Sequence, residues 1–254
     1  WGLLSFVAVA GLGLAVVVAI KYWDEIVAEL DADDLNPMPR IFGPANVPRT
    51  IVLHRAGLAL TGGEDDSRRN VSSVVATKRP AATIPKYAGS DTHWREFVRC
   101  LNKVFLPYEV RIVEQRPADE NYVLVVVGGM PSALGYEKRI AGLAPYNGDV
   151  VDDPIAFVFS RTLAEDPIKM CETAAEEIGH TYGLDHEYHC KDPMTYLSSC
   201  GTQAFQNVDA SCGELKKRPC KNGQPTQNTH ARLLSVLGPR QPKAAAASTS
   251  PKPK

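Results

Sequence analysis

The stretch AAEEIGHTYGLDHEYHCKDPMTY, residues 174–196, brings acidic side chains and histidines together at short, regular spacings. Asp166 and the proline after it supply a capping carboxylate and a first helical residue, so we expect a helix that runs from there into the stretch. A helix has about 3.6 residues per turn, so Glu176 and His180 lie one above the other on a single face. The apolar residues of the segment fall on the opposite side. One face therefore belongs to the core, and the other carries polar chemistry.

The polar face has the composition of a metal site. Gly183 can end the helix in a left-handed conformation, which would turn the chain and bring His186 back toward His180. Zinc accepts imidazole nitrogen and carboxylate oxygen at roughly 2.0–2.2 Å. Glu176, His180 and His186 are therefore candidate ligands of one Zn²⁺, with the fourth position left to water. Glu177, about 100° around the helix from Glu176, is the candidate general base for that water.

This pattern resembles the metzincin signature, H-E-x-x-H-x-x-G-x-x-H followed by a methionine turn. Glu176 departs from it, because it stands where the signature has its first histidine. The resemblance covers residues 176–196. The positions that agree with the signature and its Met-turn are Glu177, His180, Gly183, His186, Met194 and Tyr196.

The resemblance implies a fold and an activity. The fold would be a metzincin-like zincin domain, in which a twisted mixed sheet of about five strands and two long helices lie above a small, irregular, disulfide-rich C-terminal subdomain. The activity would be that of a zinc endopeptidase, in which metal-activated water attacks a peptide bond directly. Tyr196 would lie near the metal as an extra ligand or oxyanion donor. A strand at 155–160 would be the edge strand that binds an extended peptide.

The glutamate at position 176 leaves three outcomes open. Glu176 binds the metal, and its negative charge then makes the ion a weaker Lewis acid than three imidazoles would. Alternatively, it points to solvent, and the domain is an inactive metzincin-like pseudopeptidase that binds peptide or protein. In the third outcome another ligand replaces it, with His189 preferred over Asp185 and Asp192. We favour a working peptidase, because the base, both histidines, the glycine and the Met-turn are all present.

Apolar spacing predicts further elements on both sides of the metal motif. A helix capped by Ser90 is expected, because apolar residues recur at three- and four-residue steps as far as Phe105. The continuous apolar run at 122–127 predicts a central strand that is buried on both faces. This order predicts an α+β domain divided by a cleft. The remaining elements are expected at 51–54, 108–113 and 155–160 (strands) and at 227–237 (a final helix).

The cysteines and one acidic loop suggest further sites. The cysteine count is even, which favours three disulfides in an exported protein. Asp149, Asp152 and Asp153, in a long Gly/Pro-rich segment, could contribute to a Ca²⁺ site, but an exposed acidic loop is the favoured interpretation. Helix geometry and local spacing suggest the disulfides Cys100–Cys171, Cys190–Cys200 and Cys212–Cys220.

The N-terminal residues determine the expected location. Residues 1–20 carry no charge, and their length matches the ~20 residues that span a bilayer. Val17-Val18-Ala19 nevertheless offers a signal cleavage site, so both a signal peptide and a membrane anchor are expected possibilities. Either would place a secreted or membrane-anchored protein outside the cytoplasm, in contact with the membrane only through this segment. A linker at 21–48, a catalytic domain at 49–238 and a disordered tail at 239–254 follow.

Composition limits the classes of partner. Of 254 residues, 44% are hydrophobic and 22% are charged, which is ordinary for a globular protein with one substantial core. The formal net charge is −1, so no overall field draws the chain to nucleic acid or to anionic lipid. We therefore expect a monomer that acts on a peptide or protein substrate and binds no nucleic acid.

Overall fold

The structure is a computed structural model, and it describes residues 47–241. The expected signal peptide or anchor at 1–20 lies outside the described residues, as do nearly all of the linker at 21–48 and of the tail at 239–254. Within the described part of the chain, no helix is long and apolar enough to cross a membrane.

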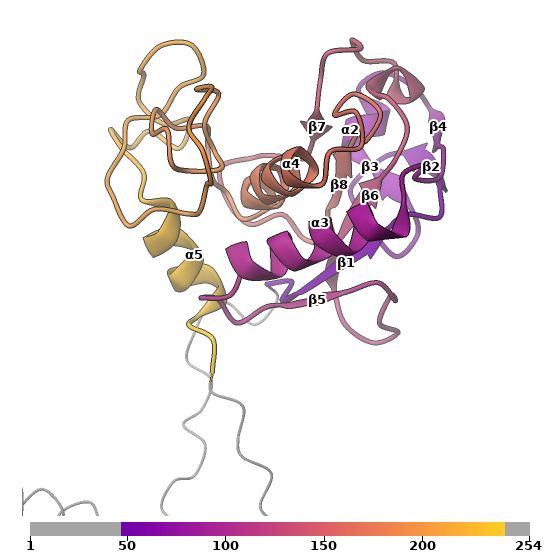
Figure 1. Cartoon of the computed structure of the whole chain (residues 1–254), viewed down its shortest axis with the longest axis horizontal. Coiled ribbons are helices and arrows are strands. Elements are labelled where there is room, and N and C mark those ends of the chain that lie inside the picture. The colour runs from indigo at the N-terminus through magenta and orange to yellow at the C-terminus, as the bar shows by residue number, and fades with distance from the viewer. Residues whose placement is uncertain (1–46, 242–254) are drawn as a thin grey trace, which may run out of the picture. The chain divides into compact units, whose positions relative to one another are not determined.

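A mixed five-stranded sheet forms the centre of the described structure (Figure 1). Its strands lie in the order β5-β1-β6-β8-β7, and all neighbouring pairs are parallel except β8 and β7. The mixed sheet of about five strands that the resemblance implies is thereby confirmed. The strands are β1 (Thr50–His54), β5 (Arg111–Val113), β6 (Tyr122–Val127), β7 (Gly142–Leu143) and β8 (Ile155–Val158).

Strand β6 is central, because its side chains are apolar on both faces. All six of its residues are buried. Val123, Val125 and Val127 join the core that packs against the two long helices. Tyr122, Leu124 and Val126 join a second core on the other face. A strand that is covered on both faces has a continuous apolar sequence. The central strand that the apolar run at 122–127 predicts is thereby confirmed.

The edge of the sheet differs from the expectation. The strand at 155–160 was expected at the edge, but β8 lies between β6 and β7, and β7 is the edge strand. Leu143 pairs with Phe157 and Gly142 with Val158, in antiparallel register. Strand β7 has only two residues and lies in the Gly/Pro-rich segment, so it is too short to show any periodicity.

Two long helices cover one face of the sheet and lie side by side (Figure 1). Helix α3 (Asp91–Val104) begins after Ser90, whose side chain accepts a hydrogen bond from the His93 N–H. Helix α4 (Pro167–Thr181) begins after Asp166, whose carboxylate caps the first turn. The disulfide Cys100–Cys171 joins the two helices. All three disulfides have the expected pairing, the others being Cys190–Cys200 and Cys212–Cys220.

A second, smaller sheet was not expected. It has the order β3-β2-β4 and packs with short helices against the second core. Much of its sequence reads as a polar turn, so neither a strand nor a helix pattern is visible there. The elements are β2 (Leu58–Gly62), β3 (Val71–Ser72), α2 (Ser73–Ala76), β4 (Ala81–Ile84) and the 3₁₀ helix η1 (Pro131–Leu134).

After α4 the chain is irregular until helix α5 (Thr229–Leu237), which Asn228 caps through the Ala231 N–H. Both ends of the folded region extend beyond the expected limits of 49 and 238. Val47 is buried in the core, and Arg240 donates hydrogen bonds to the carbonyls of Leu106 and Val110. The residues next to these limits therefore belong to the folded domain.

Candidate metal centre

Helix α4 and the turn after it bring the predicted ligands together. The helix ends at Thr181, and Gly183 adopts φ +84°, which turns the chain as expected. An added Cβ at Gly183 would lie 2.9 Å from the Asp149 Cα, so the turn needs glycine both for its conformation and for space. His186 then returns to the end of the helix, and its ring lies edge-on to that of His180.

The three candidate ligands converge on one point. The Nε2 atoms of His180 and His186 are 3.0 Å apart. The Oε1 atom of Glu176 is 3.3 Å from the His186 Nε2, and all three ligand atoms lie within 4.8 Å of one another. The side chain of Glu176 is only 16% exposed. Glu176 therefore faces the histidines rather than solvent.

Hydrogen bonds determine which nitrogen of each histidine faces the centre. The Nδ1 of His180 lies 2.8 Å from the carbonyl oxygen of Leu184, which can only accept, so this Nδ1 carries a proton. The Nδ1 of His186 lies 3.1 Å from the carboxylate of Glu214 and is likewise a donor. In the neutral rings both Nε2 atoms therefore present lone pairs to each other. Such an arrangement needs a cation between the rings, either a metal ion or a proton.

The residues present fit a divalent metal ion. Two nitrogen ligands at ~2.0–2.1 Å from a tetrahedral zinc ion lie about 3.3 Å from each other. The 3.0 Å between the Nε2 atoms of His180 and His186 is close to this separation. Imidazole and carboxylate also suit other first-row ions, so the donor set alone does not select the metal.

Burial shifts the pKa values of the histidines and glutamates of the centre. It lowers the pKa of His180 to about 3, which keeps this ring in the neutral form that a metal requires. Burial alone would lower the pKa of His186 too, but hydrogen bonds with Glu176 and Glu214 outweigh it and raise that pKa. Burial also raises the pKa of Glu176 and Glu177, and the charge of Glu176 raises that of Glu177 further. A cation bound here would favour the ionised form of both carboxylates.

The other predicted site residues surround this centre. Glu177 is 6% exposed, and its carboxyl lies against Gly142 of β7, where an added Cβ would collide with it. The ring of Tyr196 lies 4.4 Å from that of His186 between centroids, and the residue is 56% exposed. Met194 is fully buried, with its sulfur directly beneath Gly179 of α4.

Of the three alternative ligands, only Asp185 belongs to a group of potential metal ligands in residues 47–241, together with His186 and Glu214. Asp192 is buried and accepts hydrogen bonds from the N–H groups of Met194 and Gln206 and from the Thr229 hydroxyl. His189 joins neither group of potential metal ligands found in residues 47–241. The three aspartates proposed for Ca²⁺ (Asp149, Asp152 and Asp153) are likewise in neither group. Asp149 pairs instead with Arg232 at 2.7 Å.

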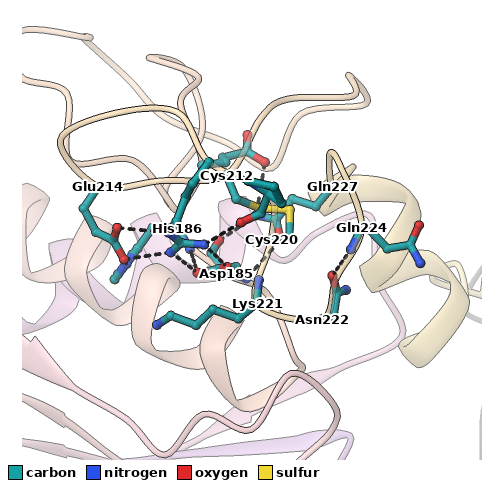
Figure 2. Close-up of polar contacts among 12 residues, drawn as sticks. Asp185, His186, Cys212, Glu214, Cys220, Lys221, Asn222, Gln224 and Gln227 are labelled. Atoms are coloured by element: carbon teal, nitrogen blue, oxygen red, sulfur yellow. Dashed lines mark hydrogen bonds and ion pairs between the residues drawn. A yellow bond between two sulfur atoms is a disulfide. The ribbon is translucent and has the colours of Figure 1, made fainter.

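Two neighbours of the centre were not predicted. Glu214 contacts His186 from the loop that the disulfide Cys212–Cys220 closes (Figure 2). Tyr146 lies with its ring 5.5 Å from that of His180. Among residues 47–241 its hydroxyl is buried without a hydrogen-bond partner, and burial raises its pKa to about 12. Both residues come from irregular segments, so no periodic pattern could identify them.

Comparison with known proteins adds no relative. No protein-family description matches the chain, and no curated protein matches its sequence.

Proposed function

We propose that this chain is a zinc-dependent endopeptidase of the metzincin type that acts outside the cytoplasm. The observation that carries the proposal is the convergence of Glu176, His180 and His186, with Glu177 buried beside them. Two imidazoles and one carboxylate are also the ligand set of other zinc peptidases, in which a water completes the coordination. The three disulfides are typical of an oxidising, extracytoplasmic environment.

The side chains around the centre suggest how the reaction would proceed. A bound zinc ion would supply Lewis acidity toward the scissile carbonyl and toward a water molecule. Glu177 would take the proton of the attacking water and later deliver it to the leaving amine nitrogen. Tyr196 would donate its phenol proton in a hydrogen bond to the developing oxyanion.

Strand β7 offers a place for an extended substrate. It is the edge strand of the sheet, and Gly142 contacts the side chain of Glu177. An extended peptide could add to this edge through main-chain hydrogen bonds, which would lay its backbone alongside Glu177, the proposed base. The substrate class that follows is an unfolded peptide or a flexible protein segment.

One observation favours a second function. A protonated His186 could donate to both Glu176 and Glu214, and this would satisfy the cluster without any metal. The domain would then be an inactive module that binds peptide along β7. The two functions differ in their dependence on metal.

The test is casein cleavage by the purified full chain. We expect cleavage that a chelator abolishes and added zinc restores. A chain that binds zinc without cleaving casein or gelatin would support the inactive alternative. Absence of metal by elemental analysis after zinc supplementation would rule out the peptidase.

A further inference from the structure

The loop at residues 212–220, here called the brace loop, packs against the turn that carries His186 (Figure 2). The disulfide Cys212–Cys220 closes this loop. Its Gly213 N–H donates to the main-chain carbonyl of His186 at 2.8 Å. The loop therefore contacts the backbone of a candidate metal ligand as well as its side chain.

Glu214 is the contact between the brace loop and the His186 ring. Its Oε1 lies 3.1 Å from the His186 Nδ1 and 2.8 Å from Nη2 of Arg218, which comes from the same loop. Arg218 donates to both carboxyl oxygens of Glu214, from Nε to Oε2 at 3.3 Å and from Nη2 to Oε1, so Glu214 is paired as a carboxylate. A carboxylate can only accept, so it fixes the proton of His186 on Nδ1 and leaves Nε2 free for a metal.

Arg218 links Glu214 to a second carboxylate. Its Nη1 and Nη2 donate to Asp185 at 2.6 and 2.8 Å. The side chain of Asp185 is 1% exposed, and it also accepts the N–H of His186 at 2.8 Å. A planar guanidinium can donate paired hydrogen bonds to one carboxylate while it also contacts a second, and the compact ammonium of a lysine does not reproduce this fork.

The same residues do not form a second metal site. Asp185, His186 and Glu214 have ligand atoms within 4.8 Å of one another, which resembles a metal-binding group. The guanidinium of Arg218, however, already donates to both carboxylates. A cation therefore already lies between them.

We infer that Glu214, Arg218 and Asp185 form a brace that holds His186 in the orientation and tautomer needed to bind the metal. The inference rests on the metal site of the proposed function. His186 lies beyond the end of α4, so the helix does not fix its side chain as it fixes those of Glu176 and His180. The brace supplies this constraint through the side chain, the N–H and the carbonyl of His186.

The test measures zinc affinity of the full chain by competition with a chromogenic chelator. Glu214→Ala should raise the Kd for zinc about 10- to 100-fold, the usual cost of losing a hydrogen-bond partner behind a ligand. Glu214→Gln should retain most of the affinity, because its amide oxygen still accepts from the His186 Nδ1–H. Glu120→Gln is the matched control, because Glu120 pairs with Arg111 at the opposite edge of the sheet. Its Kd should equal that of the wild type.

A second readout is independent of activity and of the metal. At a pH high enough to keep the His186 ring neutral, its ¹⁵N shifts in the zinc-free wild type should report a proton on Nδ1, and Glu214→Ala should lose this preference. If Glu214→Ala does not fold, Arg218→Lys carries the test, with an expected loss of zinc affinity of several-fold.

The outcomes separate the brace from the peptidase. A wild type that binds zinc, together with a folded Glu214→Ala of unchanged Kd and unchanged His186 shifts, would overturn the brace alone. An unchanged Kd in Arg218→Lys would do the same if that variant has to be used. A wild type that binds no zinc would overturn the proposed function, and with it the brace as a metal-positioning device.

Discussion

At Glu176 a carboxylate joins two imidazoles in the candidate metal group, and in the proposed site it determines the charge of the centre. With a dication, Glu176, His180 and His186 give a net charge of about +1 rather than +2. Such an ion would lower the pKa of a bound water less, so the deprotonation of that water would depend more on the general base. The burial of Glu177 fits that role, because it raises the pKa of the carboxyl toward the range of an effective base.

Glu177→Gln should separate chemistry from metal binding. We expect kcat to fall by about 10²- to 10⁴-fold, the usual contribution of a positioned base, with zinc content unchanged. Glu172→Gln is a suitable control, because Glu172 lies on the same helix but outside the group of candidate ligands in the described residues. Casein turnover and zinc per chain would be measured for both variants. Wild-type turnover in Glu177→Gln would show that another group is the base.

Individual site residues could be predicted from the sequence only where they lie close together along the chain. Glu176 and His180 are four residues apart on a helix, and Gly183 is the residue a reversal requires, so their convergence with His186 could be predicted. Glu214 could not be predicted in the same way. It lies 28 residues beyond His186, in an irregular loop, and its position depends on the brace loop and its disulfide.

Among the elements, helices α3 and α4 were predictable because their caps and apolar faces are encoded locally. Ser90 and Asp166 accept the hydrogen bonds expected of N-caps. Strand β6 was predictable for a similar reason, as a run that is apolar on both faces. Strand β7 was not, because two residues carry no period and its place depends on pairing with β8. The correct edge of the sheet therefore emerged only from the structure.

Strand β7 provides a prediction at the scale of one element. Gly142→Ala should lower kcat/KM by about 10²-fold, because the added Cβ would meet the side chains of Glu177 and Thr173 and displace the base. Zinc binding should not change, because Gly142 is not among the candidate ligands. Peptide cleavage and zinc affinity are the two measurements. Unimpaired cleavage would mean that the base does not depend on β7.

Across the described residues, the sheet and its two helices form one part of the fold, and the irregular segment after α4 completes the candidate metal centre. Helix α4 supplies Glu176 and His180, whereas the segment beyond it supplies His186 and the residues that hold it. Disulfides Cys190–Cys200 and Cys212–Cys220 close two loops of this segment, where regular secondary structure is largely absent. The combination of helices with strands was predictable from the sequence, but the second sheet and the loop contacts depend on packing between segments far apart in the chain.

The central claim is that Glu176, His180 and His186 together bind one metal ion. Zinc bound per chain, measured by elemental analysis after equilibrium dialysis of wild type and Glu176→Ala, tests it most directly. We predict about one zinc per wild-type chain, and a large loss in Glu176→Ala at the same free zinc, because a three-ligand site becomes a two-ligand site. Equal zinc content in the two proteins would contradict the claim, and so would a wild type that retains no zinc.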